Sequence, residues 1–229
     1  MKLRQVLEGM KGDLMSSSWG DIPAWAYESA QALMQALKIV DPVTYAHCCR
    51  VGEMSRKLAR DSGLNEYEQK LAEFAGLFHD IGKMGVSQDI IAKPGKLDDR
   101  ELAIMKSHPV LSEEIVQPLA KHNFFAGILP GIRGHHERVD GTGYPDKKLG
   151  DEIPVLARII LVVDTYDAMS QTRAYRKGLP DDVVYEELKR CSGTQFDSQL
   201  VNIFLKAHPG WKTQESDQET LHQLIKKVA

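Results

Sequence analysis

The sequence predicts an all-α fold. Apolar residues recur at helical spacing along most of the chain, no segment alternates apolar and polar residues as a half-buried strand would, and loops with glycine or proline separate the periodic segments. The 229 residues are 42% hydrophobic and 27% charged, as in an ordinary globular protein. This length suits one large domain, or one domain with an extension.

The first three helices are expected over 24–40, about 43–62 and about 66–78. One face of the first carries Leu33, Met34, Leu37 and Val40. Asp41-Pro42 precedes the second helix and Gly63 follows it, while the third ends at the sequence HDIGK. These breaks are typical of helix boundaries.

Asp98 and Glu101 have the spacing of a capping box, which predicts a helix running from there toward His108-Pro109. Further helices are expected after Pro109, over 125–138 and over 154–170. The apolar run 159–163 has strand propensity, but the helix formers around it favour a buried helix.

The formal net charge of −3 provides no global positive field, which argues against a nucleic-acid polymer or an anionic membrane as partner. The N-terminus lacks the apolar core of a signal peptide, and the longest apolar run, 159–163, is too short to span a bilayer. Cys48, Cys49 and Cys191 make a poor disulfide framework. We expect a cytoplasmic protein in which Cys48 and Cys49 are small core residues.

Five of the eight histidines occupy suggestive positions: His47, His79, His108, His135 and His136. His79-Asp80 stands at a predicted helix end, and Asp164 and Asp167 share a helix face because they are three residues apart. His122, His208 and His222 lie in polar or loop contexts and are expected at the solvated surface.

The pair His135-His136 precedes a loop with the sequence DGTGYP. Its glycines allow positive φ angles, so the backbone can turn sharply after the histidines. Asp140 is expected to cap this loop locally, and the rigid Pro145 to set the position of Tyr144.

These features occur in five blocks: HDIGKMGV (79–86), AKPGKL (92–97), MKSHP (105–109), HHERVDGTGYP (135–145) and VVDTYDAMSQTRAYR (162–176). In this order they resemble the HD-GYP domain, a branch of the HD metal-dependent phosphohydrolases, over about 41–204. The resemblance implies an HD-type helical bundle around a buried metal centre, with the GYP loop beside it.

Carried over residue by residue, the resemblance implies the metal ligands His47, His79, Asp80, His108, His135, His136 and Asp164. Seven ligands are too many for one ion and suit two divalent ions, with Asp80 bridging. Imidazole and carboxylate without thiolate favour iron or manganese, with zinc or nickel as alternatives. Adjacent helical residues point about 100° apart, so His135 and His136 need not bind the same ion.

The implied activity is a cyclic-dinucleotide phosphodiesterase, in which a metal-bound hydroxide attacks phosphorus. Asp80, Lys83 and Asp167 are the implied catalytic residues: Lys83 would stabilise or protonate the leaving oxygen, and Asp167 would orient the nucleophile or Lys83. Substrate contacts are expected from Tyr144 and from Arg173 and Arg176, which would hold phosphate.

The resemblance implies cyclic di-GMP as substrate, opened to pGpG and further to GMP in some family members. Two alternatives stay open: hydrolysis of cyclic GMP-AMP or another nucleotide, and a non-catalytic module that binds a cyclic dinucleotide or a diguanylate cyclase. Val43 stands where some members have a third-metal glutamate, which favours a binuclear site. Val139 and Ala174 also depart from the family pattern and affect the substrate side.

Three segments are expected: an N-terminal helical extension (1–40), the catalytic domain (41–210) and a C-terminal amphipathic helix (211–229). The extension is too short for a receiver or PAS-like domain and would add to the core or to a homodimer contact. The apolar stripe of the last helix is formed by Leu221, Leu224, Ile225 and Val228. The GYP loop would either shape the site or contact diguanylate cyclase domains.

Overall fold

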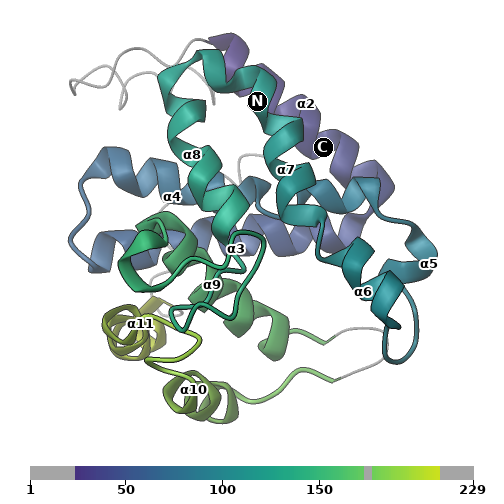
Figure 1. Ribbon diagram of the computed structural model, residues 1–229. Helices are drawn as coiled ribbons and strands as arrows, with labels where there is room; N and C mark the ends of the chain where they lie inside the picture. Colours follow the sequence, from purple (N-terminus) through teal and green to yellow (C-terminus); the bar gives the residue numbers. More distant parts are fainter. Residues whose placement is uncertain (1–23, 173–176, 212–229) are drawn as a thin grey trace.

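The computed structural model describes residues 24–172 and 177–211, shown in Figure 1. Within these ranges the chain forms helices and loops and no strand, so the all-α prediction is confirmed. The elements are α2 (Ala24–Val40), α3 (Pro42–Asp61), α4 (Glu66–Phe78), η1 (Ile81–Gly85), α5 (Gln88–Ile91), α6 (Asp99–Met105), α7 (His108–Val116), η2 (Gln117–Lys121), α8 (Asn123–Gly134), η3 (Gly150–Glu152), α9 (Val155–Ser170), α10 (Asp181–Arg190) and α11 (Ser198–Trp211).

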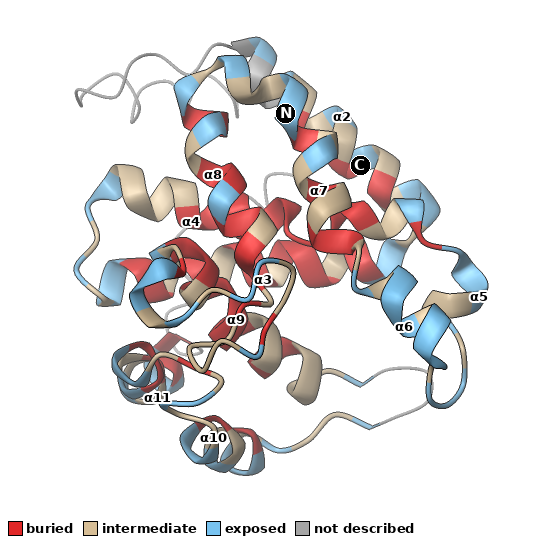
Figure 2. Cartoon of the chain, in the orientation of Figure 1, coloured by how far each residue is buried: buried red, intermediate tan, exposed pale blue. Residues whose placement is uncertain are grey.

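Helices α3 and α9 pass through the centre of the molecule, with α4 and α8 packed on them. Buried residues concentrate on these four helices, as Figure 2 shows. The run Ile159 to Val163 lies within α9 and is buried almost completely, which confirms the predicted buried helix. A helix that is apolar on all sides needs partners around it, and α9 contacts α3, α4, α8, α10 and α11.

Side-chain caps start the helices that the sequence marked. Asp41 accepts hydrogen bonds from the backbone amides of Val43 and Thr44 at the start of α3. The predicted capping box of Asp98 and Glu101 is present at α6. Each cap satisfies amide groups that have no partner inside the helix.

Two predicted boundaries were wrong. Helix α6 ends at Met105, and α7 begins at His108 with Pro109 in its first turn, where proline is well tolerated. Helix α8 ends at Gly134 and not near 138, because the Glu137 carboxylate binds backbone amides of the following loop instead of continuing the helix. Helices α10 and α11 were not predicted.

His208 is not at the surface as expected. It is buried in α11, its ring stacks on Phe204 at 4.8 Å, and Nδ1 shares a hydrogen bond with the Tyr185 hydroxyl. The spacing of 204, 208 and 211 places aromatic rings on one face of α11 and draws His208 into the core. His122 is partly buried and caps α8. His222 and the predicted C-terminal helix lie outside the described residues.

Cys48 and Cys49 are buried in the core, as predicted. Helix α2 places Ala30, Met34 and Leu37 in the same core, so residues 24–40 pack as part of the bundle. Across the described helices, none combines the length and the apolar character needed to cross a bilayer.

Candidate metal centre

Five separate segments bring their side chains to one point beside α3 and α9. The structure gathers all seven predicted ligands there: His47 from α3, His79 and Asp80 from the end of α4, His108 from the start of α7, His135 and His136 from the end of α8, and Asp164 from α9. Their donor atoms form three overlapping groups, and within each group the atoms lie no more than 4.8 Å from one another. The groups are His108, His135 and His136; His47, His79 and Asp164; and His79, Asp80 and His135.

The turn after His79-Asp80 is held tightly against α7. A Cβ atom on Gly82 would lie 2.2 Å from the carbonyl oxygen of His108, so only glycine fits without a shift. The Gly82 amide donates to Ser112 Oγ at 2.8 Å, and that hydroxyl donates to the carbonyl of His79 at 2.7 Å. Gly82 thus explains how His79 and Asp80 come to lie next to His108.

Three imidazole rings are oriented in the same way. Nδ1 of His79, His108 and His135 lies 2.6–2.7 Å from the carbonyl oxygen of the residue three positions earlier. A carbonyl only accepts hydrogen bonds, so Nδ1 carries the proton in each neutral ring. The lone pair of Nε2 therefore points into the cluster, as a metal ligand requires.

Asp80 lies between the two halves of the cluster and presents a different oxygen to each. Oδ2 is 3.5 Å from Nε2 of both His47 and His79, whereas Oδ1 is 3.1 Å from Nε2 of His108 and 4.0 Å from that of His135. Asp164 stands on the first side, with Oδ1 3.0 Å from Nε2 of His47. This placement of one carboxylate suits a bridge between two cations.

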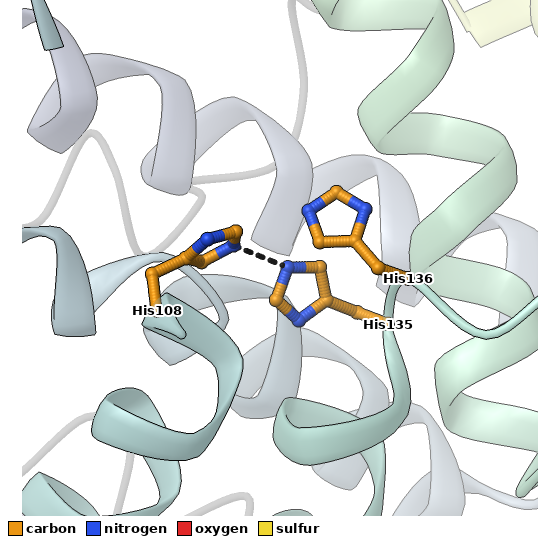
Figure 3. Close-up of side chains that lie close together, drawn as sticks. All are labelled: His108, His135 and His136. Atoms are coloured by element: carbon orange, nitrogen blue, oxygen red, sulfur yellow. Dashed lines mark hydrogen bonds between the residues drawn. The ribbon is translucent and has the colours of Figure 1, made fainter. Parts of the chain in front are cut away.

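The donor atoms lack partners that a cation would supply. Nε2 of His79 and Oδ1 of Asp80 are buried, and neither makes a hydrogen bond within the described residues. Nε2 of His108 and Nε2 of His135 lie 3.1 Å apart, although both protons sit on Nδ1. Figure 3 shows the two rings facing each other, with this contact dashed. Facing lone pairs repel each other, and buried polar atoms without partners are costly, so the residues present fit bound cations.

The electrostatics leave the ligands in the protonation states that metals need. Burial lowers the pKa of His79 and His135, and lowers that of His136 to about 3, so these rings are neutral at pH 7. Burial alone would raise the pKa of Asp80 and of Asp164. Lys83 and neighbouring histidines hold that of Asp80 below its usual range, and His47 with other histidines does the same for Asp164. Neutral imidazole and ionised carboxylate are the ligand forms.

His47 differs from the other rings. Burial lowers its pKa, but the contacts with Asp164 and Asp167 outweigh burial and raise it to about 9. A cation and a proton therefore compete for Nε2 of this ring.

The GYP loop covers the side of the cluster at His136. The Tyr144 ring stacks on the His136 ring at 4.8 Å, and the Lys106 ammonium lies 5.4 Å from the Tyr144 ring centroid. A Cβ atom on Gly143 would lie 2.4 Å from the Arg138 amide nitrogen, so the loop crosses the end of α8 too closely for a side chain there. Asp140 accepts hydrogen bonds from Thr142, which is the local cap expected from the sequence.

Lys83 lies beside the cluster and donates to Oδ2 of Asp80. Burial lowers its pKa, but Asp80 and Asp164 more than offset that effect, so the pKa is raised and the ammonium stays charged at neutral pH. The chain thus places one cationic side chain at the half of the cluster formed by His47 and His79.

Asp167 contacts the cluster through His47. Its carboxylate binds Nδ1 of His47 and the guanidinium of Arg50. The role that the resemblance implies for Asp167, orienting the nucleophile or Lys83, stays a prediction. Arg50 was missed, although its position three residues after His47 puts it on the same face of α3. Arg173 and Arg176 lie outside the described residues.

Comparison with known proteins places this fold and site in one class. The family model described as HD domain matches residues 31–200, so the chain belongs to the HD domain family. This match includes the last part of α2, ten residues before the predicted start of the catalytic domain.

Relatives within that family carry more specific names. The cyclic di-GMP phosphodiesterase response regulator RpfG of Xanthomonas campestris is 32% identical over 212 residues, which cover 90% of this chain and 56% of that protein. The 3'3'-cGAMP-specific phosphodiesterase 3 of Vibrio cholerae is 36% identical over 173 residues, which cover 74% of this chain and 37% of that protein. A cyclic di-GMP phosphodiesterase of Pseudomonas aeruginosa is 37% identical, with 75% of this chain and 41% of that protein aligned.

The chain spans about half the length, or less, of these relatives. Two solved structures share its fold. An HDG"Y"P protein of Bdellovibrio bacteriovorus, Bd1817, superposes with a TM-score of 0.60 at 18% identity, covering 81% of this chain and 63% of that one. A cyclic GMP-AMP phosphodiesterase of V. cholerae superposes with a TM-score of 0.56 at 19% identity, covering 87% of this chain and 52% of that one.

Proposed function

We propose that this chain is a metal-dependent phosphodiesterase that hydrolyses cyclic dinucleotides. The single observation that carries the proposal is the position of Asp80, whose two oxygens face two separate sets of imidazole nitrogens. Relatives at 32–37% identity are named phosphodiesterases of cyclic di-GMP or cyclic GMP-AMP, which supports the substrate class. We assign the catalytic unit to 41–210.

Two divalent ions would be held by the cluster. His47, His79 and Asp164 would bind one, and His108, His135 and His136 would bind the other, with Asp80 shared between them. The all-imidazole and carboxylate donor set favours iron or manganese. A third ion is not expected, because Val43 has no ligand atom to offer and its side chain is exposed.

When bound, such ions supply Lewis-acid stabilisation of phosphate oxygens and activation of water. The chain's own residues would position the substrate and handle charge. The Lys83 ammonium would stabilise or protonate the leaving oxygen, since it stays charged next to Asp80. Tyr144, held on His136, would contact a nucleotide at the opposite side, and Arg173 and Arg176 would hold phosphate.

The favoured reaction opens cyclic di-GMP to pGpG. Hydrolysis of cyclic GMP-AMP is the second candidate, because relatives named for that substrate align at 34% and 36% identity. A non-catalytic module is disfavoured, since the seven candidate ligands form three overlapping groups of close donor atoms and Lys83 contacts Asp80.

The test combines metal content and turnover on one sample purified without air, with cyclic di-GMP and cyclic GMP-AMP as substrates. Two ions per chain with linear product from either substrate would support the proposal and name the preferred substrate. A loaded protein that opens neither substrate, or a site that no divalent ion fills, would contradict it.

Asp80→Asn is the matched variant for this test. It keeps the shape of the side chain but removes the charge between the two sets of histidines, so we expect loss of metal and of turnover. The variant Asp151→Asn, at a side chain that is 99% exposed, is the control and should keep both. Unchanged metal content in Asp80→Asn would contradict the bridging role.

A further inference from the structure

The four most buried imidazoles of the cluster are not all held in the same way. His79, His108 and His135 each donate Nδ1–H to the backbone carbonyl of the residue three positions earlier. His47 instead places Nδ1 2.7 Å from Oδ2 of Asp167, a carboxylate from another helix. The orientation of His47 therefore depends on side chains rather than on the backbone.

Asp167 is itself held by Arg50. Nε of Arg50 donates to Oδ1 at 2.6 Å and Nη2 donates to Oδ2 at 2.8 Å, which is the bidentate geometry that a guanidinium makes with a carboxylate. The Asp167 side chain is only 2% exposed, whereas that of Arg50 is 35% exposed. A buried carboxylate thus has its charge balanced from the solvent side by Arg50 and contacts the cluster on its inner side.

The spacing on both helices produces this arrangement. His47 and Arg50 are three residues apart on α3, and Asp164 and Asp167 are three residues apart on α9, so each pair shares one helix face. Asp164 lies 3.0 Å from Nε2 of His47 while Asp167 contacts Nδ1, so the two carboxylates bracket the same ring.

We propose that Arg50 is a positioning residue for the metal centre, acting through Asp167 on His47. Its guanidinium fixes both oxygens of Asp167, Asp167 then accepts from Nδ1 of His47, and Nε2 of this ring faces Asp80 and Asp164. This inference rests on the two-metal centre proposed above. Lysine could not replace Arg50 fully, because an ammonium lacks the planar fork that binds two oxygens at once.

The outer side of the Arg50–Asp167 pair faces a cavity of about 300 Å³. Glu53, Lys57, Tyr166 and Pro180 contribute to its lining together with Arg50 and Asp167. Because Arg50 opens to this cavity, a small planar cation could enter it and occupy the position of a truncated side chain. This provides a test that separates positioning by the guanidinium from a general contribution to folding.

The experiment titrates Mn²⁺ into the metal-free protein and measures free Mn²⁺ by electron paramagnetic resonance. Arg50→Gln should weaken one of the two sites by about 10–100-fold and leave the other unchanged, as expected when the group that orients a metal-binding histidine is lost. Arg56→Gln is the matched control, because Arg56 also lies on α3 and pairs with a buried carboxylate, Glu73, away from the cluster. It should bind Mn²⁺ like the unaltered chain.

Arg50→Ala with added guanidinium ion supplies the second measurement. Guanidinium, below concentrations that unfold the protein, should restore the weakened site, whereas urea, which has nearly the same shape without charge, should not. Equal Mn²⁺ affinity in Arg50→Gln and the unaltered chain would overturn the proposal, and so would equal weakening in Arg56→Gln or no rescue by guanidinium.

The unaltered chain separates this inference from the proposed function. If it binds two Mn²⁺ ions but hydrolyses no cyclic dinucleotide, the proposed activity fails while the affinity comparison still decides the role of Arg50. If it binds neither Mn²⁺ nor any other divalent ion, both are overturned.

Discussion

At the scale of single residues, the cluster depends on how protons are distributed. Backbone carbonyls accept from Nδ1 of His79, His108 and His135. Burial lowers the pKa of His79 and of His135 and keeps these two rings neutral. Lys83 donates to the Asp80 carboxylate but is not one of the seven candidate ligands. A change at Lys83 therefore removes a positive charge beside the cluster without removing a candidate metal ligand.

We expect Lys83→Met to lower turnover of a cyclic dinucleotide by about 10²-fold or more while metal content stays at the level of the unaltered chain. Methionine fills similar space without the charge that would stabilise the leaving oxygen. Steady-state kinetics and metal analysis of the same preparation make the comparison, with Lys57→Met on α3 as control. Turnover equal to that of the control would remove Lys83 from the mechanism.

The sequence could predict the residues of the cluster but not the side chains that orient them. Histidine and aspartate at family positions identify His47 or Asp164 directly, whereas Arg50 resembles any helical arginine until α9 brings Asp167 against it. His208 was misplaced for another reason: Pro209 and Gly210 resemble a loop in the sequence, whereas α11 continues to Trp211 and places His208 among aromatic rings.

At the scale of elements, close backbone contacts position the ligands. The turn 79–82 lies against the start of α7 at Gly82. The GYP loop, 140–145, lies against 136–138, just after α8, at Gly143. The sequence predicted α2 and α4 to the residue because apolar periodicity and the breaks that follow them mark both helices. It could not predict the end of α8, which depends on a contact between Glu137 and residues about ten positions later.

Gly82→Ala tests the first contact. The added Cβ would meet the His108 carbonyl oxygen and the Ser112 amide nitrogen at 2.2 and 2.4 Å, both backbone atoms, so we expect a loss of about 2–3 kcal/mol in the free energy of unfolding. Gly210→Ala in α11 is the control, because a Cβ there meets nothing within 4 Å and alanine favours a helix. Equal free energies of unfolding for the two variants, measured by denaturant unfolding, would contradict this packing.

Glu137→Gln tests how the loop after Tyr144 is held. The buried Glu137 carboxylate accepts hydrogen bonds from the amides of Asp146, Lys147 and Lys148. A glutamine side chain has one acceptor oxygen, so at least one of these backbone N–H groups would face the side-chain NH₂ group, which is also a donor. We expect the free energy of unfolding to fall by about 2 kcal/mol. Hydrogen exchange should accelerate at 146–148 in this variant but not in Glu152→Gln, which alters an exposed cap.

At the scale of the whole molecule, the cluster joins segments that are distant in sequence. Its residues run from His47 to Asp164 and come from α3, the α4–η1 junction, α7, the end of α8 and α9. Helix α2 adds its apolar face to the same core, and the family match likewise begins within it, at residue 31. A cation bound at this junction would link most of the bundle at once, so metal binding and global stability should be coupled.

Metal removal should therefore lower the melting temperature of the whole chain. An ion that binds only the folded state at about 100 times its dissociation constant stabilises by about 2.7 kcal/mol, which for a chain of this size raises the melting temperature by roughly 5–10 °C. Differential scanning calorimetry of the metal-free protein, with and without added Mn²⁺, measures this shift. Asp80→Asn should show little shift, because its bridging charge is gone, whereas Asp151→Asn should behave like the unaltered chain. An equal shift in Asp80→Asn would mean that Mn²⁺ stabilises the protein elsewhere than at the cluster.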